Sequence, residues 1–216
     1  QLDHMIGKVV KHVVRDINIR SVLAPVPLLS SLINGAIEQR RDMTAGGAKF
    51  RTLALLAESA AHCIDSLTAV KQVVFEQQQA TVAELSGALD ANFAGHEALR
   101  AKLLAAPKYG NDDERADAIG RELIDAFCSL TAKHAEQYKQ VVRFPCGAGT
   151  FSWYIGIGQG LGASPDGRLA GEPVSSNFSP ALGRDKDGLP SAILSYSKMH
   201  SSNLPATKVQ PSGPRN

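Results

Sequence analysis

FPCGAGTFSWYIGIGQGLGASPDGRLAGEPVSSNFSP, residues 144–180, has the most distinctive composition in this sequence. Ten of the 19 glycines lie between Gly147 and Gly188, where the backbone must turn or approach its neighbours too closely for a Cβ atom. Trp153, the single tryptophan, and Tyr154 are bulky anchors among these small residues. We therefore predict a shaped loop system that carries the functional site and is held by more helical segments before it.

Apolar residues at helical spacing fill those earlier segments. A stripe from Leu2 to Ile17 predicts an amphipathic helix. Further helices are predicted for residues 27–43, from Ser59 to a polar turn at 77–79, from a Thr81 and Glu84 capping box to Phe93, for 97–105, and for a long segment containing Ile119 and Leu130. The short apolar run at 52–57 predicts a buried strand, so the fold class is α/β.

The composition of the 216-residue chain narrows its function. A formal net charge of +2 is too small to attract nucleic acid or an anionic membrane, and no apolar run reaches the roughly 18 residues of a membrane span. Cys63, Cys128 and Cys146 lack C-x-x-C spacing, which argues against a disulfide framework or a zinc site and favours a reducing cytoplasm. We therefore expect no nucleic-acid partner, no membrane partner and no bound metal.

Several tempting motifs have plainer explanations. The glycines from Gly156 to Gly162 alternate as G-x-G-x-G-x-G, but dinucleotide loops need G-x-G-x-x-G and a following helix, whereas SPDGR predicts continued loop. Asp65, Asp166 and Glu172 are candidate acids, yet Asp166 stands between a proline and a glycine, which is typical of a turn. The serines of GEPVSSNFSP lack a G-x-S-x-G elbow.

The acidic group before the long helix is also assigned to structure. Asp112, Asp113 and Glu114 stand where a helix N-terminus favours negative charge. We therefore interpret them as capping residues rather than catalytic acids.

Five motifs, in order, resemble the later part of the large domain of glycyl radical enzymes, the pyruvate formate-lyase-like family. They are PLLSSLINGAIEQRRDMTAGGAKF (27–50), DSLTAVKQVVFE (65–76), APKYGNDDE (106–114), GASPDGRLAGEPVSSNFSP (162–180) and DKDGLPSAILSYSKM (185–199). The resemblance covers residues 1–199, and residues 200–216 form a divergent polar tail. It implies a helix-rich part of a ten-stranded α/β barrel.

The resemblance also implies radical chemistry. In this family an activating enzyme with an iron-sulfur cluster and S-adenosylmethionine installs a radical on a glycine, and the radical passes to a cysteine that abstracts hydrogen from a small-molecule substrate. A C–C or C–heteroatom bond then breaks. The family resemblance leads us to expect the activating enzyme, the remainder of the same polypeptide and a second copy in a homodimer as partners.

Two family motifs do not occur here. No cysteine stands in G-C-x-x-E, and R-V-x-G-Y does not follow Met199. The chain opens on Gln1 with a helical pattern already running. We therefore expect an internal fragment or half of a split enzyme, inactive alone and without a catalytic residue or bound cofactor of its own. A noncatalytic binding or assembly module is the alternative.

The GEPVSSNFSP segment is the candidate for substrate contact, with Val174, Ser175, Ser176, Asn177 and Phe178 offering apolar surface and a few polar groups. The alternative is that this loop only closes the barrel. Family dehydratases have A-D-G near Ser176 and Asn177 and Y-N-F-T-G after GGAK, where this chain has FRTLA. These departures, with FSWY, favour an arylacetate-type decarboxylase; a formate acetyltransferase or a diol or amine dehydratase-lyase is the alternative.

Overall fold

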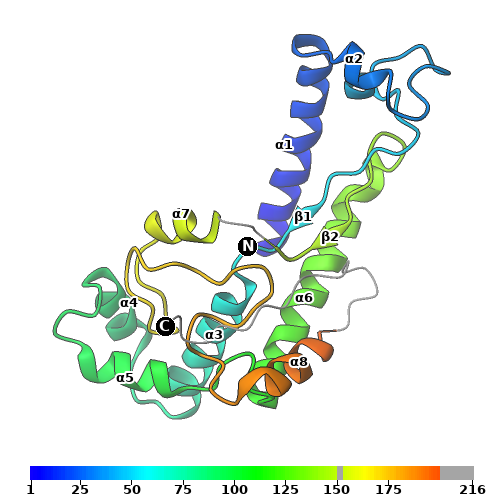
Figure 1. Ribbon diagram of the computed structural model, residues 1–216. Coiled ribbons are helices and arrows are strands. Elements are labelled where there is room, and N and C mark those ends of the chain that lie inside the picture. The colour runs from blue at the N-terminus through cyan, green and yellow to red at the C-terminus, as the bar shows by residue number, and fades with distance from the viewer. Residues whose placement is uncertain (150–152, 200–216) are drawn as a thin grey trace. The chain divides into compact units, whose positions relative to one another are not determined.

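The computed structural model describes residues 1–149 and 153–199 (Figure 1). Within these ranges the chain is mainly helical, with one two-stranded sheet. It divides into two compact units, the first formed by Gln1–Leu55 and Ala126–Cys146 and the second by Leu56–Asp125 and the chain from Gly147 onward. The expected polar tail, 200–216, lies outside the described residues, as do Phe151 and Ser152 of the FSWY motif.

The first unit is built on α1 (Leu2–Leu23), which confirms the predicted first helix. Its buried residues are Ile6, Val10, Val14 and Ile17, all from the predicted apolar stripe. A Cβ at Gly7 would lie 2.8 Å from Cε1 of the His134 ring, so the glycine allows close packing there. Asp3 forms ion pairs with Lys133 and His134.

The predicted helix over residues 27–43 is wrong in its length. The helix α2 spans only Pro27–Ser30, and turns follow until a short 3₁₀ helix, η1, at Met43–Ala45. The Asp42 side chain accepts hydrogen bonds from the backbone N–H of Val26 and from the Ser30 hydroxyl, which folds the segment back on itself. Gly35 has a φ of +98°, a conformation that interrupts a helix.

The predicted strand at 52–57 is confirmed in part. Its regular portion, β1 (Leu55–Leu56), pairs with β2 (Cys146–Gly147), a partner that sequence reasoning did not identify. The pairing is parallel, because the N–H groups of Leu53, Leu55 and Ala57 donate in turn to the carbonyls of Arg143, Pro145 and Gly147 at 2.8–2.9 Å.

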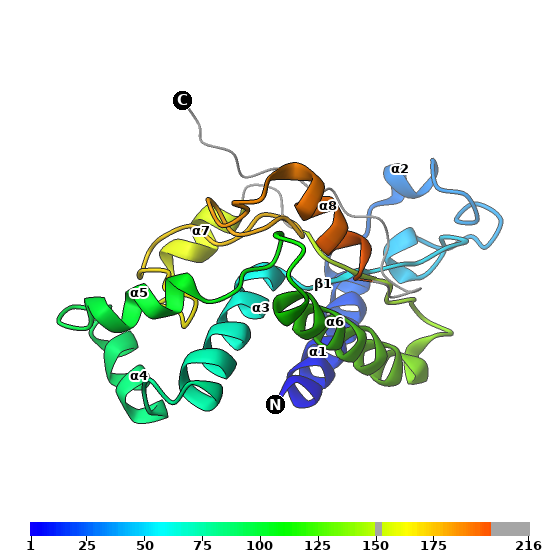
Figure 2. The same ribbon diagram turned by 90° about the horizontal axis from the view of Figure 1, so that it is seen from below.

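The second unit contains most of the remaining predicted helices. Helix α3 (Ala60–Ala69) continues as a π-helical segment, η2 (Val70–Glu76), and is followed by α4 (Val82–Asp90) and α5 (Glu97–Ala105). Figure 2 shows these helices following one another along the chain. Their buried apolar side chains pack into one cluster. The members of this cluster are Ala69, Val73, Val74, Leu85, Ala88, Phe93, Leu103 and Ala106. The capping box of Thr81 and Glu84 is present as predicted.

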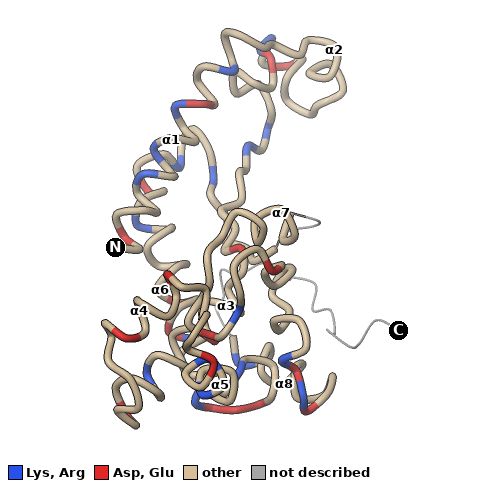
Figure 3. Tube along the Cα trace, turned by 90° about the vertical axis from the view of Figure 1, so that its left-hand side faces the viewer, with Lys and Arg blue, Asp and Glu red and all other residues tan. Residues whose placement is uncertain are grey.

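Helix α6 (Glu114–Ala135) begins at Glu114, the last member of the acidic group. Asp113 accepts a hydrogen bond from the backbone N–H of Arg115, as expected for a capping residue, and Asp112 instead pairs with Lys198. The short η3 (Glu136–Tyr138) follows α6. Figure 3 shows acidic and basic residues interspersed along the trace.

The Gly-rich stretch is not entirely loop, which corrects the prediction. Helix α7 (Trp153–Gln159) contains the first two of the alternating glycines, Gly156 and Gly158, and α8 (Gly188–Ser197) follows the stretch. Trp153, which we expected to be a bulky anchor, is 71% exposed and so does not anchor the stretch by burial. In the two described ranges, no helix combines the length and apolar character needed to cross a membrane.

Candidate functional site

The GEPVSSNFSP loop has buried and half-buried members. Val174, Ser175 and Phe178 are at most 2% exposed, whereas Ser176 and Asn177 are half-buried. The five predicted contact residues therefore divide into three that face the interior of the second unit and two that retain accessible surface.

Aromatic packing holds one end of the loop. The Phe178 ring lies 5.1 Å from the Tyr109 ring and 5.9 Å from the Tyr196 ring, measured between centroids. The Tyr109 hydroxyl donates to the Phe178 carbonyl at 3.3 Å. Because the Phe178 side chain is fully buried, it anchors the loop.

The half-buried pair has a defined geometry. The Asn177 side-chain N–H donates to the Ser176 hydroxyl oxygen at 3.0 Å. Asn177 has a φ of +53°, in the left-handed region that only glycine, asparagine and aspartate adopt readily. A Cβ at Gly149 would lie 3.1 Å from the Asn177 Oδ1 atom, so this glycine allows the two segments to approach closely.

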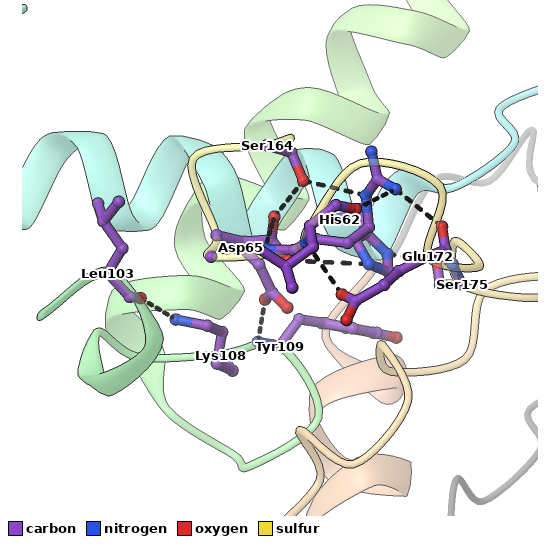
Figure 4. A network of polar contacts seen from close by, with 12 residues as sticks. His62, Asp65, Leu103, Lys108, Tyr109, Ser164, Glu172 and Ser175 are labelled. Carbon is purple, nitrogen blue, oxygen red and sulfur yellow. Dashed lines mark hydrogen bonds and ion pairs between the residues drawn. The ribbon is translucent and has the colours of Figure 1, made fainter. Parts of the chain in front are cut away.

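A histidine that sequence reasoning did not single out lies beneath the loop (Figure 4). The Nδ1 atom of His62 accepts a hydrogen bond from the Ser175 backbone N–H at 3.0 Å, and the Nε2 atom lies 3.7 Å from the Asp166 Oδ2 atom. His62 comes from α3, 113 positions before Ser175. The sequence carried no local signal for this pairing, since it joins two distant segments.

Asp166 confirms its interpretation as a turn residue. Its Oδ1 atom accepts a hydrogen bond from the Ser164 hydroxyl and from the Arg168 backbone N–H. The Arg168 guanidinium donates to the carbonyls of Gly162, Leu169 and Glu172. The SPDGR turn is therefore a closed polar network around an arginine that is 3% exposed.

A second buried network contains Asp65, another candidate acid. Its Oδ1 atom accepts from the Tyr109 backbone N–H at 2.7 Å, while burial raises the pKa of Asp65 to about 8. Burial also lowers the pKa of Lys108 to about 8, and its ammonium donates to the carbonyls of Leu103 and Ala106 at the end of α5. These contacts fix the APKYGNDDE segment.

The cysteines are poor candidates for a reactive thiolate. Burial raises the pKa of Cys63 and raises that of Cys146 to about 11, so both thiols stay protonated near neutral pH. Cys128 is buried. Among the described residues, no group of three His, Cys, Asp or Glu side chains has the geometry to hold a metal ion.

A hollow of about 230 Å³ lies in the first unit beside α2. It is lined by Pro27, Ser30, Ser31, Ala36, Ile37, Arg40, Arg41 and Asp42. None of the five predicted contact residues is among them. The Ser176 and Asn177 pair lies in the second unit, between the buried residues Ser175 and Phe178.

Comparison with known proteins identifies the family of the chain. Residues 1–157 match the family model described as pyruvate formate lyase-like. The trans-4-hydroxy-L-proline dehydratase of Clostridioides difficile is 37% identical over 192 residues, or 84% of this chain and 23% of the dehydratase. The isethionate sulfite-lyase of Bilophila wadsworthia is 41% identical over 133 residues, or 61% of this chain and 15% of the lyase.

A solved structure shows the same relationship. The crystal structure of a glycyl radical enzyme from Archaeoglobus fulgidus superposes with a TM-score of 0.82 at 31% identity, over 93% of this chain and 26% of that protein. The chain thus spans about a quarter or less of these relatives. The likeness confirms the predicted fold class, a helix-rich part of the α/β barrel of such enzymes. The chain belongs to the pyruvate formate lyase-like family of glycyl radical enzymes.

Proposed function

We propose that this chain supplies the substrate-contact loop of a glycyl radical dehydratase or lyase. The observation that carries the proposal is the Ser176 and Asn177 pair, half-buried and hydrogen-bonded, in a loop whose neighbours Val174, Ser175 and Phe178 are buried. A few fixed polar groups on a rigid support are what recognition of a small polar substrate requires. The buried residues position the loop, and the polar pair contacts the substrate.

An elimination reaction replaces the arylacetate decarboxylation that we expected from the sequence. The two enzymes compared above are named for loss of water and for release of sulfite. The sequence differences from A-D-G at Ser176 and Asn177 therefore distinguish this chain from particular dehydratases, but they do not indicate a decarboxylase. We infer a substrate with a hydroxyl, amino or sulfonate leaving group. Acyl transfer that forms acetyl products is the less favoured alternative.

The radical itself would come from other parts of the enzyme. The family relationship supports a glycyl radical, installed by an activating enzyme, and a thiyl residue, both outside the 216 residues. Leu23, Leu28 and Leu32 are 77–82% exposed, which supports packing against further barrel elements from the same polypeptide. We propose that the 216-residue chain is inactive alone, and that the complete enzyme is a homodimer.

The test is an anaerobic assay of a complete polypeptide that carries this segment, after treatment with its activating enzyme. The panel contains trans-4-hydroxy-L-proline, glycerol, isethionate, an arylacetate, and pyruvate with coenzyme A. We expect loss of water, amine or sulfite from one member of the first three or from a close analogue. Carbon dioxide release from the arylacetate or acetyl-coenzyme A formation would overturn the elimination proposal.

Two variants test the role of the polar pair. Ser176→Ala and Asn177→Gly should each raise the KM about tenfold or more, because a lost hydrogen bond to a bound substrate costs about 1–3 kcal/mol. Ser31→Ala, which removes an exposed hydroxyl that donates to the Leu28 carbonyl, is the control and should leave KM unchanged. Unchanged KM in both loop variants would favour the alternative that the loop only closes the barrel.

A further inference from the structure

The His62 imidazole contacts a different partner with each nitrogen. The Nδ1 atom accepts the Ser175 backbone N–H at 3.0 Å, and the Nε2 atom faces the Asp166 Oδ2 atom at 3.7 Å. His62 is 9% exposed and Ser175 is 1% exposed, so water does not compete freely for either contact. One ring therefore joins α3, the SPDGR turn and the GEPVSSNFSP loop.

This arrangement determines where the imidazole proton lies. A nitrogen that accepts a hydrogen bond carries no proton, so the neutral ring must be protonated at Nε2, on the side of Asp166. Asp166 is itself fixed by Ser164 and Arg168. The tautomer is thus set by the polar turn on one side and by the loop backbone on the other.

Burial keeps the ring neutral near pH 7. Burial lowers the pKa of His62, Arg168 and Arg184 lower it further, and Asp166 and Glu172 oppose these effects. A second proton would have to be placed on Nδ1. That proton would point at the Ser175 N–H, and two donors would then face each other.

We propose that His62 is a positioning residue for the substrate-contact loop, acting as a neutral acceptor that fixes Ser175 and so sets the register of Ser176 and Asn177. The backbone N–H of Val174 donates to the Tyr154 carbonyl of α7 at 3.1 Å, so consecutive amides bind the loop to two helices. The hydroxyl of Ser175 is buried without a hydrogen-bond partner among the described residues. The backbone bond to His62 is therefore the polar contact that this residue makes with α3. Protonation of His62 in acid releases it.

The direct test is NMR spectroscopy of a complete polypeptide that carries this segment, with ¹⁵N-labelled histidine and serine. At pH 7 we expect an unprotonated Nδ1, a protonated Nε2, and a scalar coupling across the hydrogen bond between the Ser175 nitrogen and the His62 Nδ1 atom. The coupling and the hydrogen-exchange protection of the Ser175 amide should disappear together on acidification. A protonated Nδ1, or a Ser175 amide that stays protected after His62 is charged, would overturn the proposal.

Variants in a complete, activated polypeptide test the consequence for catalysis. His62→Asn keeps an acceptor near the position of Nδ1, and His62→Leu keeps comparable volume without one. We expect His62→Leu to raise KM about tenfold with a smaller effect on kcat, and His62→Asn to restore KM to within about threefold of the wild-type value. Equal KM values for the two variants would contradict positioning through this bond.

The effect of the Ser175–His62 hydrogen bond on substrate binding rests on the proposed function. The NMR result does not depend on that proposal. An intact coupling combined with no elimination activity would contradict the proposed function alone. A missing coupling combined with elimination activity would contradict the role of His62 alone. If His62→Leu does not fold, the coupling in the unsubstituted chain still decides the proposal.

Discussion

The Asp65 carboxylate accepts a hydrogen bond from the backbone N–H of Tyr109 at 2.7 Å and so joins α3 to the APKYGNDDE segment. Tyr109 in turn packs against Phe178 at the end of the candidate loop. The Asp65 Oδ2 atom is buried without a hydrogen-bond partner among the described residues. A carboxylate with one unsatisfied buried oxygen is more stable in its protonated form.

This protonation predicts a specific pH dependence of stability. Burial raises the pKa of Asp65 from 3.8 to about 8, so the folded chain binds a proton that the unfolded chain has lost between these values. The free energy of unfolding should therefore fall as pH rises from about 4 to about 8. Asp65→Asn, which mimics the neutral acid and keeps the acceptor for Tyr109, should remove at least about 1 kcal/mol of that fall. Urea unfolding at pH 5 and pH 8 measures the free energy of unfolding of the unsubstituted chain and of Asp65→Asn. An equal fall in both proteins between these pH values would refute the raised pKa of Asp65.

The alternating glycines give a matched pair of substitutions. A Cβ at Gly158 would lie 2.3 Å from the Glu172 carbonyl oxygen, whereas a Cβ at Gly156 has nothing within 4 Å. Gly158→Ala should destabilise the chain by about 1–3 kcal/mol, because backbone atoms must move. Gly156→Ala should stabilise it by up to about 1 kcal/mol, because alanine favours a helix. Urea midpoints compare them, and equal shifts would show that α7 does not pack against the loop in this way.

The backbone of Asn177 predicts which residues can replace it. Its φ of +53° should accept glycine, whereas Asn177→Val should cost about 1–2 kcal/mol through steric strain. Thermal unfolding monitored by circular dichroism measures the effect. Equal melting temperatures for the valine and glycine variants would mean that this residue is not left-handed in solution.

The ion pairs of Lys198 should matter more than those on the surface. Lys198 lies 2.6 Å from Asp112 and 2.7 Å from the fully buried Asp117, and these hydrogen bonds raise the pKa of Lys198. Lys198→Met should cost roughly 2–3 kcal/mol, since Asp117 would keep a buried charge without a partner. Lys139→Met removes an exposed pair with Glu136 and should change stability by less than about 0.5 kcal/mol. Urea unfolding at neutral pH compares the two, and similar losses would contradict the burial of Asp117.

Local sequence patterns predicted those helices and strands that are determined by residues close together in the chain. The stripe of α1 and the capping box of α4 each depend on residues within a few positions of one another, and both are present. The strand predicted at 52–57 is present in part, as Leu55–Leu56. The length of α2 was not predictable in this way, because Asp42 closes that segment by bonding to Val26, sixteen positions earlier. Helix α7 was missed because four glycines in seven positions are typical of loop, and packing stabilises the helix instead.

The site shows the same division. The motif GEPVSSNFSP led to the loop that the proposal concerns, which stays a prediction, but it did not indicate which of the loop's side chains are buried. Phe178 is interior because its ring packs against Tyr109, which is 69 positions earlier in the chain. The sequence did not indicate a role for His62 for the same reason, because its hydrogen-bond partner Ser175 is more than a hundred residues away.

A loop exchange tests the central claim most directly. Residues 171–180 of this chain would replace the aligned loop of the Clostridioides difficile trans-4-hydroxy-L-proline dehydratase, and the chimera would be activated under anaerobic conditions. The account predicts that the glycyl radical signal in electron paramagnetic resonance is retained while KM for trans-4-hydroxy-L-proline rises at least about tenfold, because the exchanged residues contact substrate rather than generate the radical. A chimera with the full radical signal and an unchanged KM would contradict the claim that this loop contacts the substrate.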